Sequence, residues 1–186
     1  INPKHKKIQG VPAYQTLEQI GKEVDLAVVA TPASTVPGII EECGQYGVRA
    51  AVVLTAGFAE AGQAGIALER QVLETARRYG LRFIGPNCLG VMRPSIGLNA
   101  TFNKGCAKPG NLALVSQSGA LCTAILDWAK PNDVGFSSVI SMGSSADMDF
   151  GEILDFLASD TQTESILLYI EGIRNSRSFM SSLRAA

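Results

Sequence analysis

Short runs of hydrophobic residues recur along the chain, and each run is followed by a segment of helical length in which polar and apolar residues mix. The runs are continuous rather than alternating, a pattern typical of strands that are buried on both faces of a parallel sheet. The pattern predicts strands at 25–30, 50–54, 81–84, 112–115, 136–141 and 165–170, and helices at 35–46, 63–79, 118–129, 149–158 and 176–185. Such alternation of strands and helices indicates right-handed βαβ units and a doubly wound α/β fold.

The helix expected over 118–129 has apolar residues at helical spacing, namely Leu121, Ala124, Ile125 and Trp128. Residues three and four positions apart lie on the same side of a helix, so these side chains form one apolar face. The face supports the prediction of a helix in this segment.

One stretch breaks the alternation of strands and helices. From Arg93 to Gly110, the sequence RPSIGLNATFNKGCAKPG contains no convincing helix and is rich in Gly, Pro and Asn. A long segment without regular structure is unusual inside a compact domain and common between two domains. We therefore expect a boundary near residue 105, with one domain over 1–105 and a second over 106–186.

The two ends of the chain suggest a fragment of a longer protein. The chain begins with Ile1 rather than Met and enters a polar loop directly. We expect the first domain to lack its opening strand. The second domain contains three βα units, and we expect it to continue beyond Ala186.

The composition excludes several classes of partner. The 186 residues are 46% hydrophobic and 18% charged, with a net charge of −1, which gives no electrostatic reason to expect nucleic acid or a membrane surface. No apolar run approaches the roughly 20 residues that span a bilayer, and no secretory leader is recognisable. The four cysteines are far apart and form no CxxC pair, so no metal site is expected, and reduced thiols favour a cytoplasmic location.

Ligands of open α/β sheets bind beyond the carboxyl ends of the strands, so the turns that follow the strands are the candidate sites. These turns are rich in small, hydroxylic and glycine residues, and they read TPAS (31–34), TAGFAE (55–60), GPNCLG (85–90), SQSGAL (116–121), MGSSADMD (142–149) and EGIRN (171–175). A single turn of this kind is ordinary in α/β proteins. Six in succession favour a long ligand that crosses the edge of the sheet.

Two of the polar segments have alternative interpretations. In SQSGAL, the start of a helix offers free N–H groups to an anion, although Ser118 would serve equally well as a plain N-cap. The basic segment NPKHKK is either a solvated loop or a clamp for a ligand phosphate.

The sequence contains no GxGxxG motif and no P-loop lysine motif. As a nucleophile, Cys88 would need a base, and His5 is the only histidine.

Taken in order, these turns resemble those of the NDP-forming acyl-CoA synthetases, the family that includes the α subunit of succinyl-CoA synthetase. The resemblance extends along essentially the whole chain and rests on NPK…IQGVPAY, TPAS, LTAGFAE, GPNCLG, GLNATF, SQSGAL and IEGIRN. It implies two doubly wound parallel-sheet domains. The first is a Rossmann-like CoA-binding domain without its first strand, and the second is a partial flavodoxin-like succinyl-CoA-ligase domain.

The resemblance also implies roles for individual residues. Residues in contact with CoA would be Lys4, Thr31, Pro32, Leu54, Thr55, Ala56, Asn87 and Cys88. Gly85 and Gly90 would allow the pantetheine arm of CoA to approach the GPNCLG turn. The phosphoryl group would be held by Ser116, Ser118 and Gly119. Glu171 would act as the catalytic residue that orients a phosphorylated histidine.

The resemblance further implies that the complete protein is an acid–thiol ligase that makes or consumes acyl-CoA. The phosphorylated histidine of the family lies beyond the end of this chain, and His5 does not match it, so the fragment alone should be inactive. Ala56 stands where succinyl-CoA synthetases carry Glu, which favours another acyl group, such as acetyl. The implied cofactors are CoA, with ATP/ADP or GTP/GDP and Mg in the complete enzyme. The implied partners are acyl-CoA or acyl phosphate and an ATP-grasp domain or subunit. Assembly of the chain into a homo-oligomer is a further possibility.

Two other functions remain alternatives. Bacterial protein lysine acetyltransferases carry a degenerate copy of this region, which binds acyl-CoA or regulates the fused acetyltransferase, and GLNATF and ILDWA also suit those proteins. A nicotinamide dehydrogenase is the third hypothesis, which the absence of a dinucleotide fingerprint disfavours.

Overall fold

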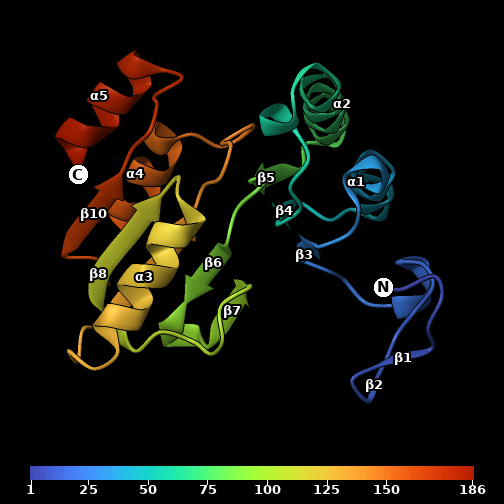
Figure 1. Cartoon of the computed structure of the whole chain (residues 1–186), viewed down its shortest axis with the longest axis horizontal. Coiled ribbons are helices and arrows are strands. Elements are labelled where there is room, and N and C mark those ends of the chain that lie inside the picture. Colours follow the sequence, from blue (N-terminus) through green and yellow to red (C-terminus); the bar gives the residue numbers. More distant parts are fainter.

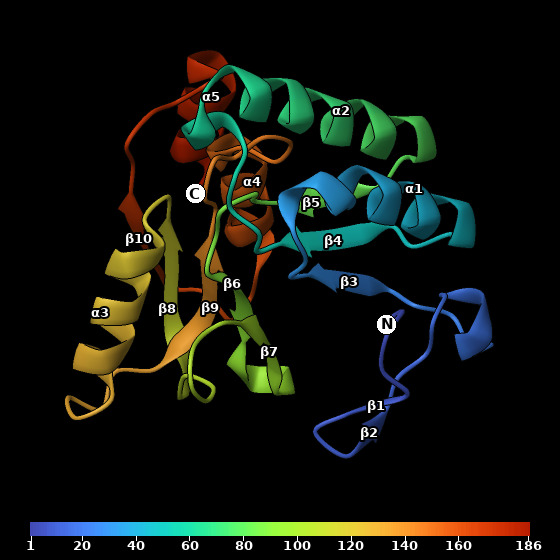
Figure 2. The ribbon, with the colours of Figure 1, turned by 45° about the vertical axis from the view of Figure 1, so that its right-hand side comes forward.

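The computed structural model describes residues 1–186 as an α/β protein with two separate main sheets (Figure 1). The first sheet is parallel with the order β3-β4-β5 and contains β3 (Leu26–Val29), β4 (Ala50–Val53) and β5 (Arg82–Ile84). Helices α1 (Val36–Tyr46) and α2 (Gln63–Tyr79) connect these strands and pack against each other. Both helices lie on one side of the sheet (Figure 2).

The first sheet has large apolar side chains on the face that the two helices cover. Val53 and Phe83 are almost fully buried together with Val36 and Ile40 of α1 and Val72 of α2. Successive side chains of a strand point to opposite faces, so the intervening residues face the other side. Val52 belongs to a separate, smaller cluster on that side, next to the second sheet.

The second sheet has the order β10-β8-β9-β6-β7. Its strands are β6 (Gly90–Arg93), β7 (Leu98–Thr101), β8 (Pro109–Ser116), β9 (Phe136–Ser141) and β10 (Ser165–Tyr169). Strands β10, β8 and β9 are parallel, whereas β6 and β7 form an antiparallel hairpin that pairs with β9 through β6. The sheet is therefore a parallel core with an antiparallel edge, a common combination in α/β proteins.

Helices cover both faces of the second sheet. Helix α3 (Gly119–Ala129) packs on one face, where Leu114 lies in its cluster. Helices α4 (Phe150–Ser159) and α5 (Ser176–Ala185) pack on the other face, against Ala113 and its neighbours. None of the helices is both long enough and apolar enough to cross a membrane.

The remaining elements are short. A two-stranded hairpin joins β1 (Lys7–Ile8) to β2 (Val11–Pro12) near the N-terminus. Single 3₁₀ turns occur at Glu18–Ile20, Ala33–Thr35, Ala59–Ala61 and Pro94–Ile96.

The expected fold class is confirmed. All the strands and helices expected from the hydrophobic pattern are present, and their ends differ from the expectation by at most three residues. The sequence pattern missed β6 and β7 as well as the N-terminal hairpin. Strand β6 is short, and its pairing partner β9 lies more than forty residues further along the chain.

The expectation of an unstructured linker over 93–110 is wrong. The stretch contains the end of β6, all of β7 and the start of β8, and all three strands belong to the second sheet. Met92 pairs with Val139 and is only 1% exposed, so the hairpin is part of the core of the second sheet. The chain passes from the first sheet to the second between Ile84 and Gly90. The division of the chain into 1–105 and 106–186 stays a prediction.

The buried face of α3 also differs from the expected one. The buried residues are Cys122, Leu126 and Ala129, whereas Trp128 is 61% exposed. Helix α3 carries apolar residues on more than one side, so the apolar pattern alone did not select the side that meets the sheet. The side chain of Ile125 packs only at the margin of the core.

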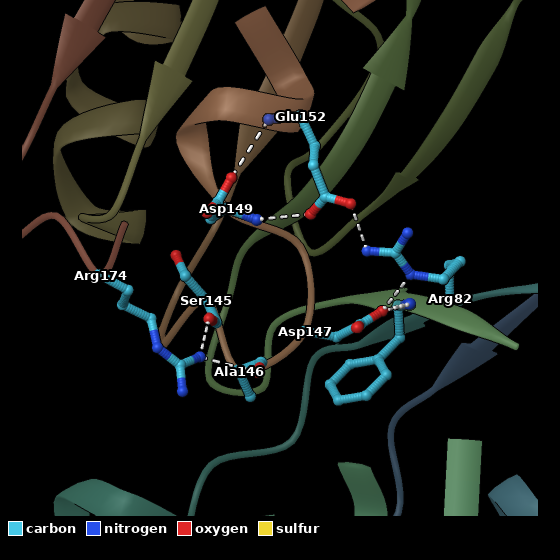
Figure 3. Close-up of polar contacts among 8 residues, drawn as sticks. Arg82, Ser145, Ala146, Asp147, Asp149, Glu152 and Arg174 are labelled. Carbon is cyan, nitrogen blue, oxygen red and sulfur yellow. Dashed lines mark hydrogen bonds and ion pairs between the residues drawn. The ribbon is translucent and has the colours of Figure 1, made fainter. Parts of the chain in front are cut away.

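An ion-pair network joins the two sheets (Figure 3). Arg82 at the start of β5 contacts Asp147, with Nε 2.8 Å from Oδ2, and Glu152 of α4, with Nη2 2.6 Å from Oε1. The same Oδ2 of Asp147 accepts the backbone N–H of Phe83 at 3.0 Å. One carboxylate thus binds both the side chain and the backbone of β5, which ties the loop after β9 to the first sheet.

Backbone hydrogen bonds extend this junction to the GPNCLG turn. The N–H of Ser144 donates to the carbonyl of Pro86 at 2.9 Å, and the N–H of Ala146 donates to the carbonyl of Gly85 at 3.0 Å. The contact is so close that a Cβ on Gly143 would lie 2.2 Å from the carbonyl oxygen of Pro86. The loop over 142–149 therefore holds the GPNCLG turn in place through direct backbone contacts.

Candidate functional site

A cleft of about 740 Å³ lies beyond the carboxyl ends of β3, β4 and β8, where residues of both sheets meet. Most of the site residues expected from the sequence line it, namely Thr31, Leu54, Thr55, Ala56, Asn87, Cys88, Ser118, Gly119 and Glu171. The cleft also contains residues that were not expected, namely Ala30, Leu89, Phe102, Gln117, Ala120 and Thr123. These residues come from segments that are far apart in sequence, and only the fold brings them together.

Hydrogen bonds connect the three turns on the first-sheet side of the cleft. The hydroxyl of Thr55 donates to the carbonyl of Thr31 at 2.7 Å, and the N–H of Leu54 donates to the carbonyl of Val29 at 2.9 Å. The N–H of Asn87 donates to the carbonyl of Thr55 at 2.9 Å. The wall of the cleft is therefore fixed by the protein itself before any ligand binds.

The glycines of the GPNCLG turn are required by the protein's own packing. Gly85 has a φ of +101°, and a Cβ there would lie 2.3 Å from the carbonyl oxygen of Val53. Gly90 has a φ of +116°, and a Cβ there would lie 2.0 Å from the carbonyl oxygen of Ala100. Both glycines are required by the close approach of the protein's own backbone. That they also let the pantetheine arm of CoA approach the turn stays a prediction.

Cys88 is buried in this turn and is not suited to nucleophilic catalysis. Its Sγ lies 3.3 Å from the carbonyl oxygen of Val53, to which the thiol donates. Burial raises the pKa of the Cys88 thiol to about 12. A thiol is nucleophilic only as the thiolate, so at neutral pH Cys88 is a neutral wall of the cleft. Asn87 beside it is exposed and has a φ of +55°.

In the SQSGAL turn the structure shows the N-cap interpretation, and anion binding stays a prediction. Ser118 is the N-cap of α3, and its Oγ accepts the N–H of Leu121 at 3.3 Å. The N–H groups of Gly119 and Ala120 have no acceptor in the structure. These two groups line the cleft, at the end of the helix where the dipole favours an anion. The helix is capped, and two donors still remain for a ligand.

Ser116 supports the turn rather than facing the cleft. It is fully buried, its Oγ accepts the N–H of Ser118 at 3.0 Å, and its hydroxyl donates to the carbonyl of Ser118 at 2.9 Å. The sequence could not separate this residue from Ser118, because both are serines of the same motif. The structure gives Ser116 a supporting position in the turn that presents the N–H groups of Gly119 and Ala120.

Glu171 follows β10 by two residues and lines the cleft beside Ser118. Its carboxylate makes no hydrogen bond or ion pair in the structure, while its backbone N–H donates to Oε1 of Gln117 at 2.7 Å. An acidic group without a partner next to unpaired N–H donors is available to a ligand or to another protein segment. Glu171 thus lies at the cleft where residues of both sheets meet, and its catalytic role stays a prediction.

Lys4 and Pro32 do not line the cleft. Lys4 is exposed in the N-terminal segment before β1, where its backbone N–H donates to the side chain of Asn2 at 2.9 Å. Pro32 is exposed next to Thr31, and its carbonyl accepts the hydroxyl of Thr35 at 2.7 Å. Contacts of these two residues with a ligand stay predictions.

Gln117 and Phe102 are the cleft residues that sequence reasoning missed most clearly. Gln117 lies between the two serines of SQSGAL, and its side chain reaches the loop after β10, where it accepts the N–H groups of Glu171 and Gly172. Phe102 is 65% exposed in the loop after β7, within the motif GLNATF, and its backbone N–H donates to the carbonyl of Leu89 at 3.1 Å. An exposed aromatic ring at a cleft offers an apolar surface to a ligand.

The chemistry of the cleft favours binding and positioning over covalent catalysis by this chain. It offers unpaired N–H donors, an unpaired carboxylate and a wall of small and apolar residues. The thiol that lines it is neutral, and no histidine is among the lining residues. These features fit a thin, partly apolar molecule on the first-sheet side and an anion at the start of α3.

The family models match both halves of the chain. Residues 1–94 match the model described as a CoA binding domain. The chain belongs to this CoA-binding family. Residues 109–186 match the model described as a succinyl-CoA ligase like flavodoxin domain. The resemblance of this CoA-binding protein to the NDP-forming acyl-CoA synthetases is thereby confirmed.

Curated relatives of the CoA-binding chain are acyl-CoA ligases. The ADP-forming acetate–CoA ligase I of Archaeoglobus fulgidus is 47% identical over 180 residues, which cover 97% of this chain and 26% of that protein. The α subunit of the ADP-forming acetate–CoA ligase II of Pyrococcus furiosus is 44% identical over 97% of this chain and 39% of that subunit. The chain therefore spans between about a quarter and two-fifths of these relatives.

A solved structure is similar over the whole chain. The acetyl-coenzyme A synthetase 1 of Ca. Korarchaeum cryptofilum, solved in complex with phosphate and ADP, has a TM-score of 0.93 and 38% sequence identity. The match covers 100% of this chain and 40% of that one. The arrangement of the two sheets around the cleft is thus shared with a synthetase.

Proposed function

We propose that this chain is the CoA-binding and phosphate-binding part of an NDP-forming acyl-CoA synthetase. Its substrate is a small carboxylic acid such as acetate. The observation that carries the proposal is the single cleft that joins the turns of the CoA-binding domain to the unpaired N–H groups of α3. A synthetase must bring the CoA thiol and a phosphoryl group to one place, and this cleft has a suitable wall for each. Relatives that are ADP-forming acetate–CoA ligases support the same function.

On the first-sheet side, the cleft is suited to the pantetheine arm. The backbone at 54–56 is held by the hydrogen bonds of Thr55 and Asn87, so it offers a fixed edge along which an extended molecule can lie. CoA supplies the thiol that carries the acyl group. Cys88 stays protonated and does not compete with that thiol. Lys4 and Pro32 are proposed to contact the nucleotide part of CoA, and exposed lysine suits a phosphate.

On the second-sheet side, the proposed role is to hold a phosphoryl group and a histidine. The N–H groups of Gly119 and Ala120 donate to phosphoryl oxygens at the start of α3. The carboxylate of Glu171 accepts an imidazole N–H from a histidine outside this chain. That hydrogen bond fixes the orientation of the ring and directs its other nitrogen towards the phosphorus. Ser116 and Ser118 keep the turn in shape.

The proposal includes partners that this chain does not contain. The Pyrococcus furiosus relative is an α subunit, which supports a partner subunit for this chain. We propose an ATP-grasp domain or subunit as that partner, with Mg and a purine nucleotide. ADP is favoured over GDP because the named relatives are ADP-forming. The four free thiols support the proposed cytoplasmic location.

The relatives favour the ligase over the acetyltransferase alternative. They are named as CoA ligases, and the similarity covers nearly all of this chain. The dehydrogenase hypothesis receives no support from them. The ligase is therefore the only function that we propose.

The test uses the full-length protein that carries this chain, purified with any partner subunit. Phosphorylation of the protein by labelled ATP is followed together with acetyl-CoA formation. Glu171→Gln should reduce both by at least about a hundredfold, because it replaces the charged acceptor of the proposed imidazole N–H bond by a neutral amide, which stabilises a charged partner much less. Glu74→Gln on α2 is the matched control and should behave as wild type. Phosphorylation and turnover of Glu171→Gln at the wild-type rate would show that the proposed role of Glu171 is wrong.

A further inference from the structure

The loop that carries Glu171 is poorly anchored by its own backbone. Strand β10 ends at Tyr169, and the residues from there to α5 are exposed and contain no regular secondary structure. For Glu171 and Gly172, the only hydrogen bonds in the structure come from one side chain outside the loop. A carboxylate on such a loop would sample many positions without that contact.

The side chain in question is Gln117. Its Oε1 accepts the N–H of Glu171 at 2.7 Å and the N–H of Gly172 at 3.0 Å. Its own backbone N–H donates to the carbonyl of Tyr169 at 3.2 Å, directly past the end of the β8–β10 pairing. Gln117 thus binds the loop through its backbone and through its side chain.

The base of Gln117 is itself rigid. Its neighbours Ser116 and Ser118 are joined by reciprocal hydrogen bonds, and Ser116 is fully buried. The amide oxygen therefore projects from the same turn that presents the N–H groups of Gly119 and Ala120 to the cleft. Any anion bound at this turn is held at a defined distance from the loop of Glu171.

The far end of the loop is held separately. The guanidinium of Arg174 donates through Nη1 to the carbonyls of Ser145 and Ala146, the latter at 2.7 Å, as Figure 3 shows. Between these two anchors, the Glu171 carboxylate remains without a partner. The loop is thus fixed at both ends, while the acidic group is left available.

We propose that Gln117 is a positioning residue that sets the place of Glu171 relative to the phosphate-binding turn. The inference rests on the proposed function, because it gives a purpose to the position of Glu171. The anion-binding N–H groups and the carboxylate belong to different βα units, and Gln117 is the side chain that joins them. Gln117 acts through Glu171 and does not itself exchange a proton or a bond.

The experiment compares Gln117→Met with wild type in the full-length protein. Methionine has a similar length and no strong acceptor, so it removes both hydrogen bonds and keeps the shape. The kcat should fall about ten- to a hundredfold, because a displacement of about 1 Å has effects of this size. The KM for CoA should stay unchanged. Gln45→Met, an exposed change on α1, is the matched control and should leave kcat unchanged.

Two further variants separate positioning from a merely structural role. Gln117→Glu keeps an oxygen acceptor of equal reach, so it should recover most of the kcat, while its added charge raises the KM for phosphate. Gln117→Met combined with Glu171→Gln should be no slower than Glu171→Gln alone, because residues that act through one another are not additive. Hydrogen exchange should report faster exchange at 171–172 in Gln117→Met.

The outcomes distinguish the two proposals. If Glu171→Gln is as active as wild type, the proposed function of Glu171 is wrong and the role of Gln117 is wrong with it. If Glu171→Gln is inactive but Gln117→Met has the wild-type kcat, only the positioning role is overturned. If Gln117→Met unfolds, the Gln117→Glu variant decides: a wild-type kcat supports the role, and a kcat as low as that of Glu171→Gln contradicts it.

Discussion

Replacing Gly85 by alanine tests whether the GPNCLG turn is held by the protein's own backbone. A Cβ at this position would lie 2.3 Å from the carbonyl oxygen of Val53 and 3.1 Å from Sγ of Cys88. Atoms of this size prefer separations of about 3.5 Å, so the turn has to move by about 1 Å. The residue also keeps a φ of +101°, which a side chain disfavours.

The structure allows the cost of this movement to be worked out. The displaced turn weakens the bond from Ala146 to Gly85 (3.0 Å), the bond from Asn87 to Thr55 (2.9 Å) and the thiol contact of Cys88 (3.3 Å). Each hydrogen bond contributes about 1 kcal/mol, and the positive φ costs a further 1–2 kcal/mol or so. Gly85→Ala should therefore lower the free energy of unfolding by about 4–5 kcal/mol.

Gly97→Ala is the matched control for this substitution. Gly97 also has a positive φ, +70°, but a Cβ there meets nothing within 4 Å. Its substitution should cost only the backbone strain, about 1–2 kcal/mol. Urea denaturation of both variants gives the two values, and calorimetric titration with CoA gives the affinity. Gly85→Ala should bind CoA at least about tenfold more weakly, because the cleft wall moves with the turn.

A small difference between the two variants would refute this reasoning. If Gly85→Ala and Gly97→Ala differ by less than about 1 kcal/mol in the free energy of unfolding, the close approach of Val53 does not constrain the turn. If Gly85→Ala is strongly destabilised but binds CoA with wild-type affinity, the turn is constrained and does not form the CoA site.

Three further predictions concern charge and thiol chemistry. Iodoacetamide at pH 8 should modify the exposed Cys106 first, since a pKa of about 12 leaves only about one Cys88 thiol in 10⁴ ionised; equal labelling rates by mass spectrometry would contradict this. Arg93 contacts Asp160 at 2.6 Å and lowers the pKa of that carboxyl below the ordinary aspartate value of about 4. The pair therefore stabilises the fold fully above about pH 4, and this contribution is lost as the pH falls towards the lowered pKa. The difference in urea stability between wild type and Asp160→Asn should accordingly be smaller at pH 3 than at pH 7, and a constant difference would contradict the assignment. Lys4→Ala should weaken CoA binding about fivefold at low salt and less at high salt, and titrations that show no salt dependence would argue against a phosphate contact.

The arrangement of strands and helices was determined by the sequence itself. Continuous apolar runs such as 136–141 are long enough and apolar enough to be recognised without any knowledge of their neighbours, and this one is a strand with the expected ends. The turns after the strands could also be found, because their composition and their place in the alternation are local properties. These turns supplied most residues of the cleft, including Thr55 and Ser118.

Other features depend on contacts between distant residues, and only the tertiary structure decided them. The hairpin of β6 and β7 exists because β6 pairs with β9, and the buried face of α3 is the one that meets the second sheet. The roles of Ser116 and Gln117 differ because one side chain points under the turn and the other reaches Glu171. Sequence periodicity describes which residues can be buried or can bind. It does not describe which partner each residue meets, because that depends on how separate elements pack in three dimensions.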